Sequence, residues 1–545
     1  MEKRMFVAVA LSFLVIGLYP VVLEKMYPGY ARRAEMSRAA RSAQVRKVSE
    51  PETATPTMGD AQSDAGTFLP SQDIRMDNGK VSLTFNQKGG AIREIDFPRF
   101  TDPQTRAPLR IFSLNELSGA PFSTGIWSRG GPVSPESAWK VEDKTEQRLV
   151  LASSAMDGRL SVRKTFSLPR GSYSGTFTIA FENTSAEPLE FNYSLFAGNS
   201  FPARNNIDQQ YIEANFYSSA AKPPLRHVNE KGAGKTVRSN GPVDWIAVKD
   251  RQFSLILKPK ENAGFTGFVA GLGHRSFRAS LASPAVSLSP GASVSHEFLV
   301  YMGPNDIDLL APMGLDPLIN FGKLDWIGKL LVGGLELLHK VFRNYGLAII
   351  ALTFLINLCL FPFTRASYMS MKRMQLIQPQ MNKLKEVHKK NPEKLNREMM
   401  ELYKKNKVNP FGGCLPMVIQ MPVFMALYVA LSKSVILMNS QFLWIRDLSS
   451  PDKVQLPFSL PFLGNEVHVL PLIMVGAMTI QQRFTQVKME GQDPALEAQQ
   501  KMMAVTMPVI FGFIFYTMPS GLVLYWLTNT LLMTLYQYRL KKVTL

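Results

Sequence analysis

The chain has very little cysteine: Cys359 and Cys414 are the only two in 545 residues. Both lie in or beside apolar stretches of the C-terminal half, and none lies in the long polar segment from residue 24 to about 325. Disulfide bonds therefore cannot stabilise that segment, which must build an apolar core. The six histidines are scattered without metal-ligand spacing, so we expect no metal and no other cofactor.

Acidic residues are absent from the most apolar parts of the chain. Crossing a bilayer takes about 20 residues, and six stretches reach or approach that length: residues 6–23, 347–363, 415–431, 467–482, 502–518 and 521–538. None contains Asp or Glu, whereas a proton-coupled transporter normally needs an ionisable group in the membrane. An ATP-binding loop is also missing, because Asn229 stands where the loop ending at Thr236 needs its first glycine.

Charge predicts the orientation of these spans. Residues 365–409 contain twelve Lys or Arg and four Glu, which is typical of a cytoplasmic loop. The first span follows Lys3 and Arg4 and lacks a signal-peptidase pattern, so residues 1–23 are expected to be a retained anchor. Both termini would then be cytoplasmic. The linker, residues 24–70, would be periplasmic, in the inner membrane of a bacterium.

Strand patterns follow the linker. Apolar residues alternate with polar ones around Phe177, Phe191, Phe253 and Phe298, and turn signals such as Asp157-Gly158 separate the runs. The pattern predicts half-buried strands in a periplasmic all-β sandwich over residues 71–310.

Two further helical elements are expected beside the membrane. Residues 321–342 place apolar side chains at three- and four-residue spacing, which predicts an amphipathic helix at the outer interface or, alternatively, against the sandwich. Residues 365–409 predict a basic helical hairpin, with Asn391 and Pro392 opening its second helix. Its charge suits RNA, a targeting factor or anionic lipid, although topology alone also explains it.

Polar side chains inside the spans share one depth. In the predicted orientation, one group falls in the cytoplasmic half of the membrane and another near its middle: Asn357, Gln420, Thr479, Gln481, Gln482 and Thr506, then Thr353, Thr528, Asn529 and Thr530. Such groups need partners or water in hydrocarbon. Hydrogen bonds between helices explain any one of them, at about 0.6 kcal/mol each. A wet recess open to the cytoplasm explains their common depth.

Short motifs in these spans resemble the YidC/Oxa membrane protein insertases. They are Thr353-Phe354, Phe361-Pro362-x-Thr364-Arg365, Asn409-Pro410-x-Gly412-Gly413-Cys414, Gln420-Met421-Pro422-x-Phe424, Leu443-Trp444-Ile445-x-Asp447-Leu448, Met507-Pro508 and Pro519-Ser520-Gly521-Leu522-x-Leu524-Tyr525. The resemblance covers essentially the whole chain. It implies a multi-domain membrane protein with a six-span helical bundle, whose five-span core is residues 344–545, and a mutarotase-like sandwich of unassigned activity.

The resemblance also implies which residues act. A hydrophilic groove would be lined by Asn357, Thr353, Gln420, Gln481, Gln482, Arg483, Thr506 and Asn529, and a substrate slide and core would be formed by Met421, Pro422, Phe424, Pro508, Tyr525 and Trp526. Where the family commonly places a groove arginine, this chain has Asn357. Arg483 is our candidate for supplying that charge.

The function implied is a membrane protein insertase and chaperone rather than an enzyme. It would insert and help fold nascent inner-membrane proteins through the groove, alone or with the Sec translocon, without nucleotide hydrolysis. The basic hairpin would meet the ribosome and signal-recognition machinery, and membrane lipids would surround the bundle. A polar-solute transporter and an anchored periplasmic carbohydrate-active enzyme are the alternatives.

Overall fold

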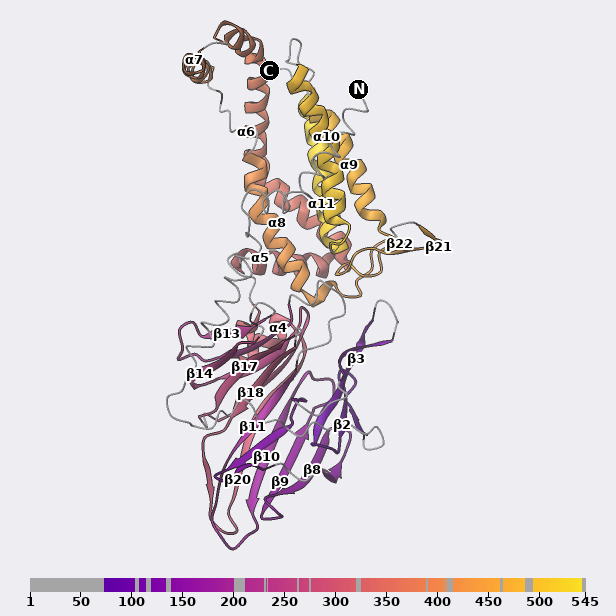
Figure 1. The fold of residues 1–545 in the computed structure, drawn as a ribbon. Helices are drawn as coiled ribbons and strands as arrows, with labels where there is room; N and C mark the ends of the chain where they lie inside the picture. Colours follow the sequence, from indigo (N-terminus) through magenta and orange to yellow (C-terminus); the bar gives the residue numbers. More distant parts are fainter. Residues whose placement is uncertain are drawn as a thin grey trace. The chain divides into compact units, whose positions relative to one another are not determined.

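A computed structural model describes residues 73–541 of the chain (Figure 1). Its internal gaps are residues 103–106, 114–118, 134–138, 200–210, 230–231, 233, 262–263, 274–275, 320–324, 389–390, 407, 409–414, 461–463 and 486–493. The expected anchor (1–23), the linker (24–70) and the motif from Asn409 to Cys414 lie outside the described residues. The described part consists of a β-domain, residues 73–319, and a helical domain, residues 325–541.

Antiparallel sheets build the β-domain. The largest has the order β13-β12-β15-β16-β20-β10-β9-β8-β7, and the second β14-β17-β18-β11-β5-β6 with β19 beside β11. A four-stranded sheet has the order β1-β2-β3-β4. The bounds are β1 (Asp73–Asp77), β2 (Ser82–Asn86), β3 (Ala91–Thr101), β4 (Pro108–Ser113), β5 (Thr124–Ser128), β6 (Gly131–Val133), β7 (Lys140–Lys144), β8 (Arg148–Ala155), β9 (Leu160–Ser167), β10 (Ser174–Asn183), β11 (Leu189–Asn199), β12 (Glu213–Tyr217), β13 (Leu225–Val228), β14 (Thr236–Pro242), β15 (Trp245–Lys249), β16 (Phe253–Pro259), β17 (Thr266–Gly273), β18 (Ser276–Ala282), β19 (Val286–Leu288) and β20 (Ser293–Pro304).

The predicted alternation is confirmed on β10, where Phe177, Ile179 and Phe181 are buried and pair in register with β9 and β20. It is wrong on β16, where Ser254 and Ile256 are as buried as Phe253. The reason is a segment that packs against this strand: α4 (Ile307–Leu310) and the 3-10 turns η3 (Ala311–Met313) and η4 (Asp316–Leu318). Its leucines join the sandwich core, so β16 is covered on both faces.

Lys164 occupies an inward position of β9, between Val162 and Phe166, and is fully buried. Its Nζ donates to the carbonyl oxygens of Gly89 and Gly90, both at 3.1 Å, and to Phe122 O at 2.7 Å. The ammonium also lies 4.2 Å from the centre of the Trp139 ring. Burial lowers the pKa of Lys164. Three carbonyls and an aromatic face nevertheless satisfy the charged form, so this side chain fastens the β2–β3 turn to β9.

Acid is expected to weaken the β-domain through Glu213 on β12. Desolvation alone would raise the pKa of Glu213, but the Lys249 ammonium 2.9 Å away outweighs it, and the pKa is lowered. A carboxylate with a lowered folded-state pKa stabilises the fold above its unfolded pKa of about 4.3 and loses that contribution as pH falls through the folded value. Glu213→Gln should therefore cost about 1–3 kcal/mol at pH 7 and flatten the loss of stability in acid.

Urea unfolding from pH 7 to pH 3 measures this effect. The matched control is Glu297→Gln, whose ion pair with Lys260 is about half exposed and should contribute at most about 1 kcal/mol. Equal pH profiles for Glu213→Gln and the unmodified chain would show that the pair does not link stability to pH.

The helical domain contains α5 (Asp325–Phe342), α6 (Tyr345–Val387), α7 (Pro392–Lys405), α8 (Leu415–Lys433), η7 (Val435–Leu437), β21 (Val454–Leu460), β22 (Gly464–Val467), α9 (Val469–Thr485), α10 (Pro494–Phe515) and α11 (Ser520–Lys541). Of the expected interface helix, the described part is α5. Its Leu331 and Leu335 are buried against the bundle while Trp326 and Val341 are exposed.

The second predicted span and the first helix of the basic hairpin form one element. α6 is 43 residues long and contains Pro362 and Pro379, and the Asn344 side chain caps its start by accepting from Leu347 N at 3.1 Å. The predicted start of α7 is confirmed, because the Asn391 side chain accepts from Lys394 N at 3.1 Å and Pro392 is the first helical residue.

One helical stretch among the described residues, Tyr345–Met374, is both long and apolar enough to cross a membrane, and Met502–Phe515 is a shorter apolar helix. The count of six spans therefore stays a prediction.

Candidate functional site

Packing inside the bundle is concentrated at one end, which we call the packed half. Its core joins six helices: Leu331 and Leu335 of α5, Ala348, Ile349 and Leu352 of α6, Ala426, Leu427 and Leu431 of α8, Leu470, Met474 and Met478 of α9, Phe515 of α10, and Leu522, Val523, Leu524 and Tyr525 of α11. Backbone contacts close this end, since Gly521 N donates to Leu448 O at 2.9 Å. The packed half leaves little room for water.

Beyond this level lies what we call the open half of the bundle. None of the residues 354–366 of α6, 420–425 of α8 or 479–483 of α9 is buried. Large apolar side chains such as Leu358, Met425 and Ile480 are exposed there. The helices are therefore packed more loosely there, where contacts such as that between the Phe361 ring of α6 and the Tyr536 ring of α11, 5.1 Å apart, remain.

Thr353, Asn357 and Asn529 meet at the boundary between the two halves. The Asn357 amide Nδ2 donates to Thr353 O at 2.8 Å on its own helix and to Asn529 Oδ1 at 3.0 Å on α11. The Thr353 hydroxyl is buried and donates to Ile349 O at 2.6 Å. Asn357 and Asn529 remain half-buried, so each retains polar atoms on the open side.

A second polar pair lies between α8 and α11, where Gln420 Nε2 donates to the hydroxyl of Tyr525. Tyr525 is fully buried, whereas Gln420 is half-buried. Thus interhelical hydrogen bonding, the alternative to a wet recess, does account for one bond of each pair. The two pairs nonetheless stand where packing ends, which is the position required of the floor of a recess.

Aromatic side chains join α8, α10 and α11 beside the second pair. Trp526 contacts Phe424, Phe511 and Phe515 with ring centres 5.0, 5.4 and 5.3 Å apart. We predicted Phe424 and Trp526 from the sequence but missed Phe511 and Phe515. Their i, i+4 spacing on an apolar helix was the available signal. The cluster forms an apolar floor next to the polar pairs.

The remaining predicted groove residues lie on α9 and α10. Gln481, Gln482 and Thr506 are half-buried, and Arg483 is exposed at the end of α9. Among the described residues Arg483 forms no ion pair and no hydrogen bond with Asn357. Of the predicted slide, Met421 and Pro422 are exposed whereas Pro508 is buried.

Among the described residues, no charged side chain takes part in the polar pairs at the boundary. The charged side chains at the mouth of the open half are positive. Along α6, α9 and α11, the first charged side chains beyond the polar pairs are Arg365, Arg483 and Arg539, and all three are exposed. We did not single out Arg365 and Arg539 as groove residues. The arrangement lets an acidic segment be attracted at the mouth and meet only neutral amides deeper inside.

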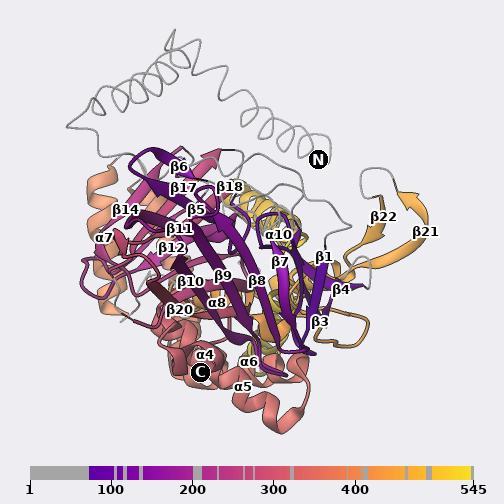
Figure 2. The same cartoon turned by 90° about the horizontal axis from the view of Figure 1, so that it is seen from below.

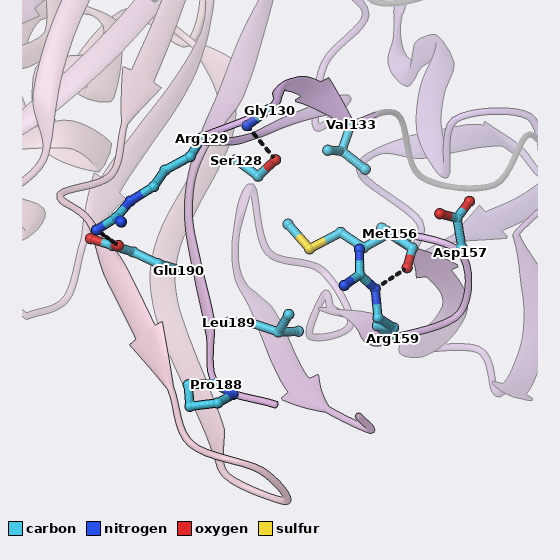
Figure 3. A pocket seen from close by; sticks show the side chains of 11 residues that line it. Ser128, Arg129, Gly130, Val133, Met156, Asp157, Arg159, Pro188, Leu189 and Glu190 are labelled. Atoms are coloured by element: carbon cyan, nitrogen blue, oxygen red, sulfur yellow. Dashed lines mark hydrogen bonds and ion pairs between the residues drawn. The ribbon is translucent and has the colours of Figure 1, made fainter. Parts of the chain in front are cut away.

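The β-domain carries a separate hollow of about 550 Å³ (Figure 3). Val133, Met156 and Leu189 give it an apolar wall, Arg129 pairs with Glu190 at 2.6 Å, and Arg159 Nε donates to Met156 O at 3.1 Å. Asp157 lies at the far side from Glu190 (Figure 3). The ion pair engages the Glu190 carboxylate with Arg129.

Comparisons with known proteins cover both domains. The family described as "60Kd inner membrane protein" matches residues 337–544, and the one described as "YidC periplasmic domain" matches residues 73–333. The curated "Membrane protein insertase YidC" of Geotalea daltonii is 32% identical over 98% of this chain and 97% of its own length.

Solved structures give a weaker likeness. One described as an active YidC insertase crystal structure with the first transmembrane domain resolved is 21% identical, with a TM-score of 0.38, over 87% of this chain and 94% of that one. A galactose mutarotase related enzyme from Lactobacillus acidophilus covers 42% of this chain and 97% of that chain at 8% identity and a TM-score of 0.29. Scores this low support no argument about activity.

The predicted class, an all-β domain joined to a helical membrane domain, is confirmed by the family matches. The family is one of inner-membrane insertases and not of catalytic enzymes. The identity over nearly the full length of the relative is decisive, and the chain belongs to the YidC family of membrane protein insertases.

Proposed function

We propose that this chain inserts membrane proteins by admitting the polar tail of a nascent protein into the open half of its bundle. The observation that carries the proposal is the level at which packing ends, with the half-buried Asn357–Asn529 and Gln420–Tyr525 pairs standing along it. Polar side chains at this level give a hydrated tail alternative hydrogen-bond partners. A tail that reaches the pairs has about half of the hydrocarbon left to cross.

The driving force in this mechanism is burial of the client's own apolar span. A bilayer core is about 30 Å thick, so shortening the dry path lowers the largest barrier to moving a polar tail. Met421 and Pro422 on α8 are exposed beside Gln420 and would guide the client's apolar segment into lipid. Phe424 and Trp526 would form the apolar floor, and no nucleotide is required.

The topology that fits this mechanism has six spans, cytoplasmic termini and a periplasmic β-domain. The open half would then face the cytoplasm, with Arg365, Arg483 and Arg539 at its mouth, as the positive-inside rule requires. The basic hairpin formed by the end of α6 and by α7 would approach the ribosome and signal-recognition machinery. The Sec translocon would take part for clients whose tails are too long or too charged for the groove.

Deleting the β-domain, residues 73–319, is expected to leave insertion largely intact. All polar residues assigned to the groove lie after residue 344, so the chemistry of the site survives the deletion. The measurement is protease protection of a single-span client in cells depleted of the unmodified protein. Loss of client protection after the deletion would mean that the function depends on the sandwich. That result would contradict a groove confined to the helical domain.

A further inference from the structure

The strands β21 and β22 form a hairpin between α8 and α9 that projects from the rest of the helical domain (Figures 1 and 2). Within the described residues the two strands pair only with each other, Val454 with Val467 and Gln455 with Glu466. A free two-stranded hairpin is at best marginally stable in water. Its surroundings must therefore contribute to its stability.

The two faces of this hairpin differ in polarity. Val454, Leu456 and Phe458 alternate with Gln455 and Pro457 in the sequence of β21, whose pairing register shifts between Gln455 and Leu460, and Phe458 is 59% exposed. On the other face the Lys453 ammonium forms an ion pair with the Glu466 carboxylate, with Nζ and Oε2 2.8 Å apart. An exposed aromatic side chain, with two half-buried apolar residues before it and an ion pair at the base of the hairpin, fits a segment that lies at a boundary between water and hydrocarbon.

The base of the hairpin is fixed to the bundle. The Asp452 carboxylate accepts from Leu470 N at 2.8 Å, at the start of α9, and from Trp444 Nε1 at 3.3 Å. The backbone N–H of His468, just after β22, donates to the Tyr516 hydroxyl at 3.4 Å. The hairpin therefore cannot turn freely about its base, and its apolar face has a defined direction.

Exposed apolar residues also occur on the elements that adjoin the hairpin. Leu472 and Ile473 on the first turn of α9 are exposed, as is Phe513 near the end of α10. Leu443 and Trp444 are exposed beside the hairpin base. In a membrane-embedded bundle such helix side chains face lipid, and tryptophan favours the headgroup level. These exposed apolar residues beside the hairpin favour lipid as the occupant of its apolar face.

We propose that the β21–β22 hairpin lies in the outer leaflet, with Phe458 below the headgroups and the Lys453–Glu466 pair among them. The inference rests on the topology given with the proposed function. It assigns to this loop a membrane-contact site that holds the outer ends of α9 and α10 at a fixed depth. The ligand class is the phospholipid headgroup and upper acyl region.

Depth-dependent quenching tests this site. We would place a single cysteine by Phe458→Cys in full-length protein carrying Cys359→Ser and Cys414→Ser, attach an environment-sensitive fluorophore and reconstitute it in phosphatidylethanolamine–phosphatidylglycerol vesicles. Gln455→Cys is the matched control on the polar face, and Leu456→Cys replaces Phe458→Cys if that variant does not fold. At position 458 we expect blue-shifted emission that shallow nitroxide lipids quench and iodide does not. At position 455 we expect emission without a blue shift that iodide quenches and nitroxide lipids do not.

Two outcomes would overturn the proposal. Iodide quenching of both positions would place the hairpin in water. Blue-shifted emission at 458 that nitroxide lipids do not reduce would mean that protein, such as a second copy of this chain, covers the face. The topology itself is tested separately: an impermeant thiol reagent should reach position 455 from the outer side only, whatever the depth of position 458.

Discussion

Replacing Asn357 and Gln420 together by leucine is expected to reduce client insertion at least about tenfold. Each substitution removes a polar side chain from the level where packing ends, and the translocating tail loses hydrogen-bond partners there. A penalty of about 1.4 kcal/mol in the barrier already corresponds to tenfold in rate. Two unpaired polar contacts in an apolar setting exceed that figure. Insertion rates of a single-span client into vesicles measure the effect.

The controls separate loss of the groove from loss of the fold. Losing the interhelical bonds themselves should cost only about 0.6 kcal/mol each, so the double variant should still unfold near the normal temperature. Asn357→Gln and Gln420→Asn keep amide groups and should retain most activity, and Asn396→Leu on the exposed face of α7 should have no effect. Full activity of a folded double-leucine variant would remove these residues from the mechanism.

Lys164→Met is expected to destabilise the β-domain by about 3 kcal/mol or more. Methionine fills a similar volume but leaves the carbonyls of Gly89, Gly90 and Phe122 without the donor that now satisfies them. Each unsatisfied buried acceptor costs about 1–3 kcal/mol. Trp139 lies against the ammonium, so its fluorescence reports unfolding at this place during a urea titration.

Lys140→Met on the exposed edge strand β7 is the matched control and should change stability by less than about 0.5 kcal/mol. Because burial lowers the pKa of Lys164, its contribution to stability should also grow as pH rises toward the unfolded value of about 10.4. A Lys164→Met protein as stable as the control would mean that the three carbonyls find water instead.

Periodicity in the sequence was enough to predict the sandwich but not which strands are covered twice. β10 alternates because one of its faces is only half-buried, whereas β16 is packed by a segment about fifty residues later in the chain. Lys164 illustrates the same limit. A lysine between two apolar inward positions predicts an interruption of the core, and only the arrangement of Gly89, Gly90 and Phe122 around it explains its burial.

The candidate site shows a similar division. The sequence identified Asn357, Gln420 and Asn529 as polar residues in apolar spans. Their partners could not be inferred, since Asn357 and Asn529 are 172 positions apart and Gln420 and Tyr525 are 105 apart. Of the cations at the mouth, Arg483 was a groove candidate from the sequence, whereas Arg365 and Arg539 were recognised there only from the ends of α6 and α11 in the structure. Helix pairing supplies this information, and spacing within one helix does not.

The most direct test of the account is insertion by the purified protein alone. A single-span client with a short uncharged or acidic tail would be presented to sealed vesicles that contain only this chain, without nucleotide or ion gradient, and tail translocation would be scored by protease protection. The account predicts protection well above that of empty vesicles. Protection no greater than in empty vesicles, with the chain folded and correctly oriented, would contradict passive insertion through the open half of the bundle.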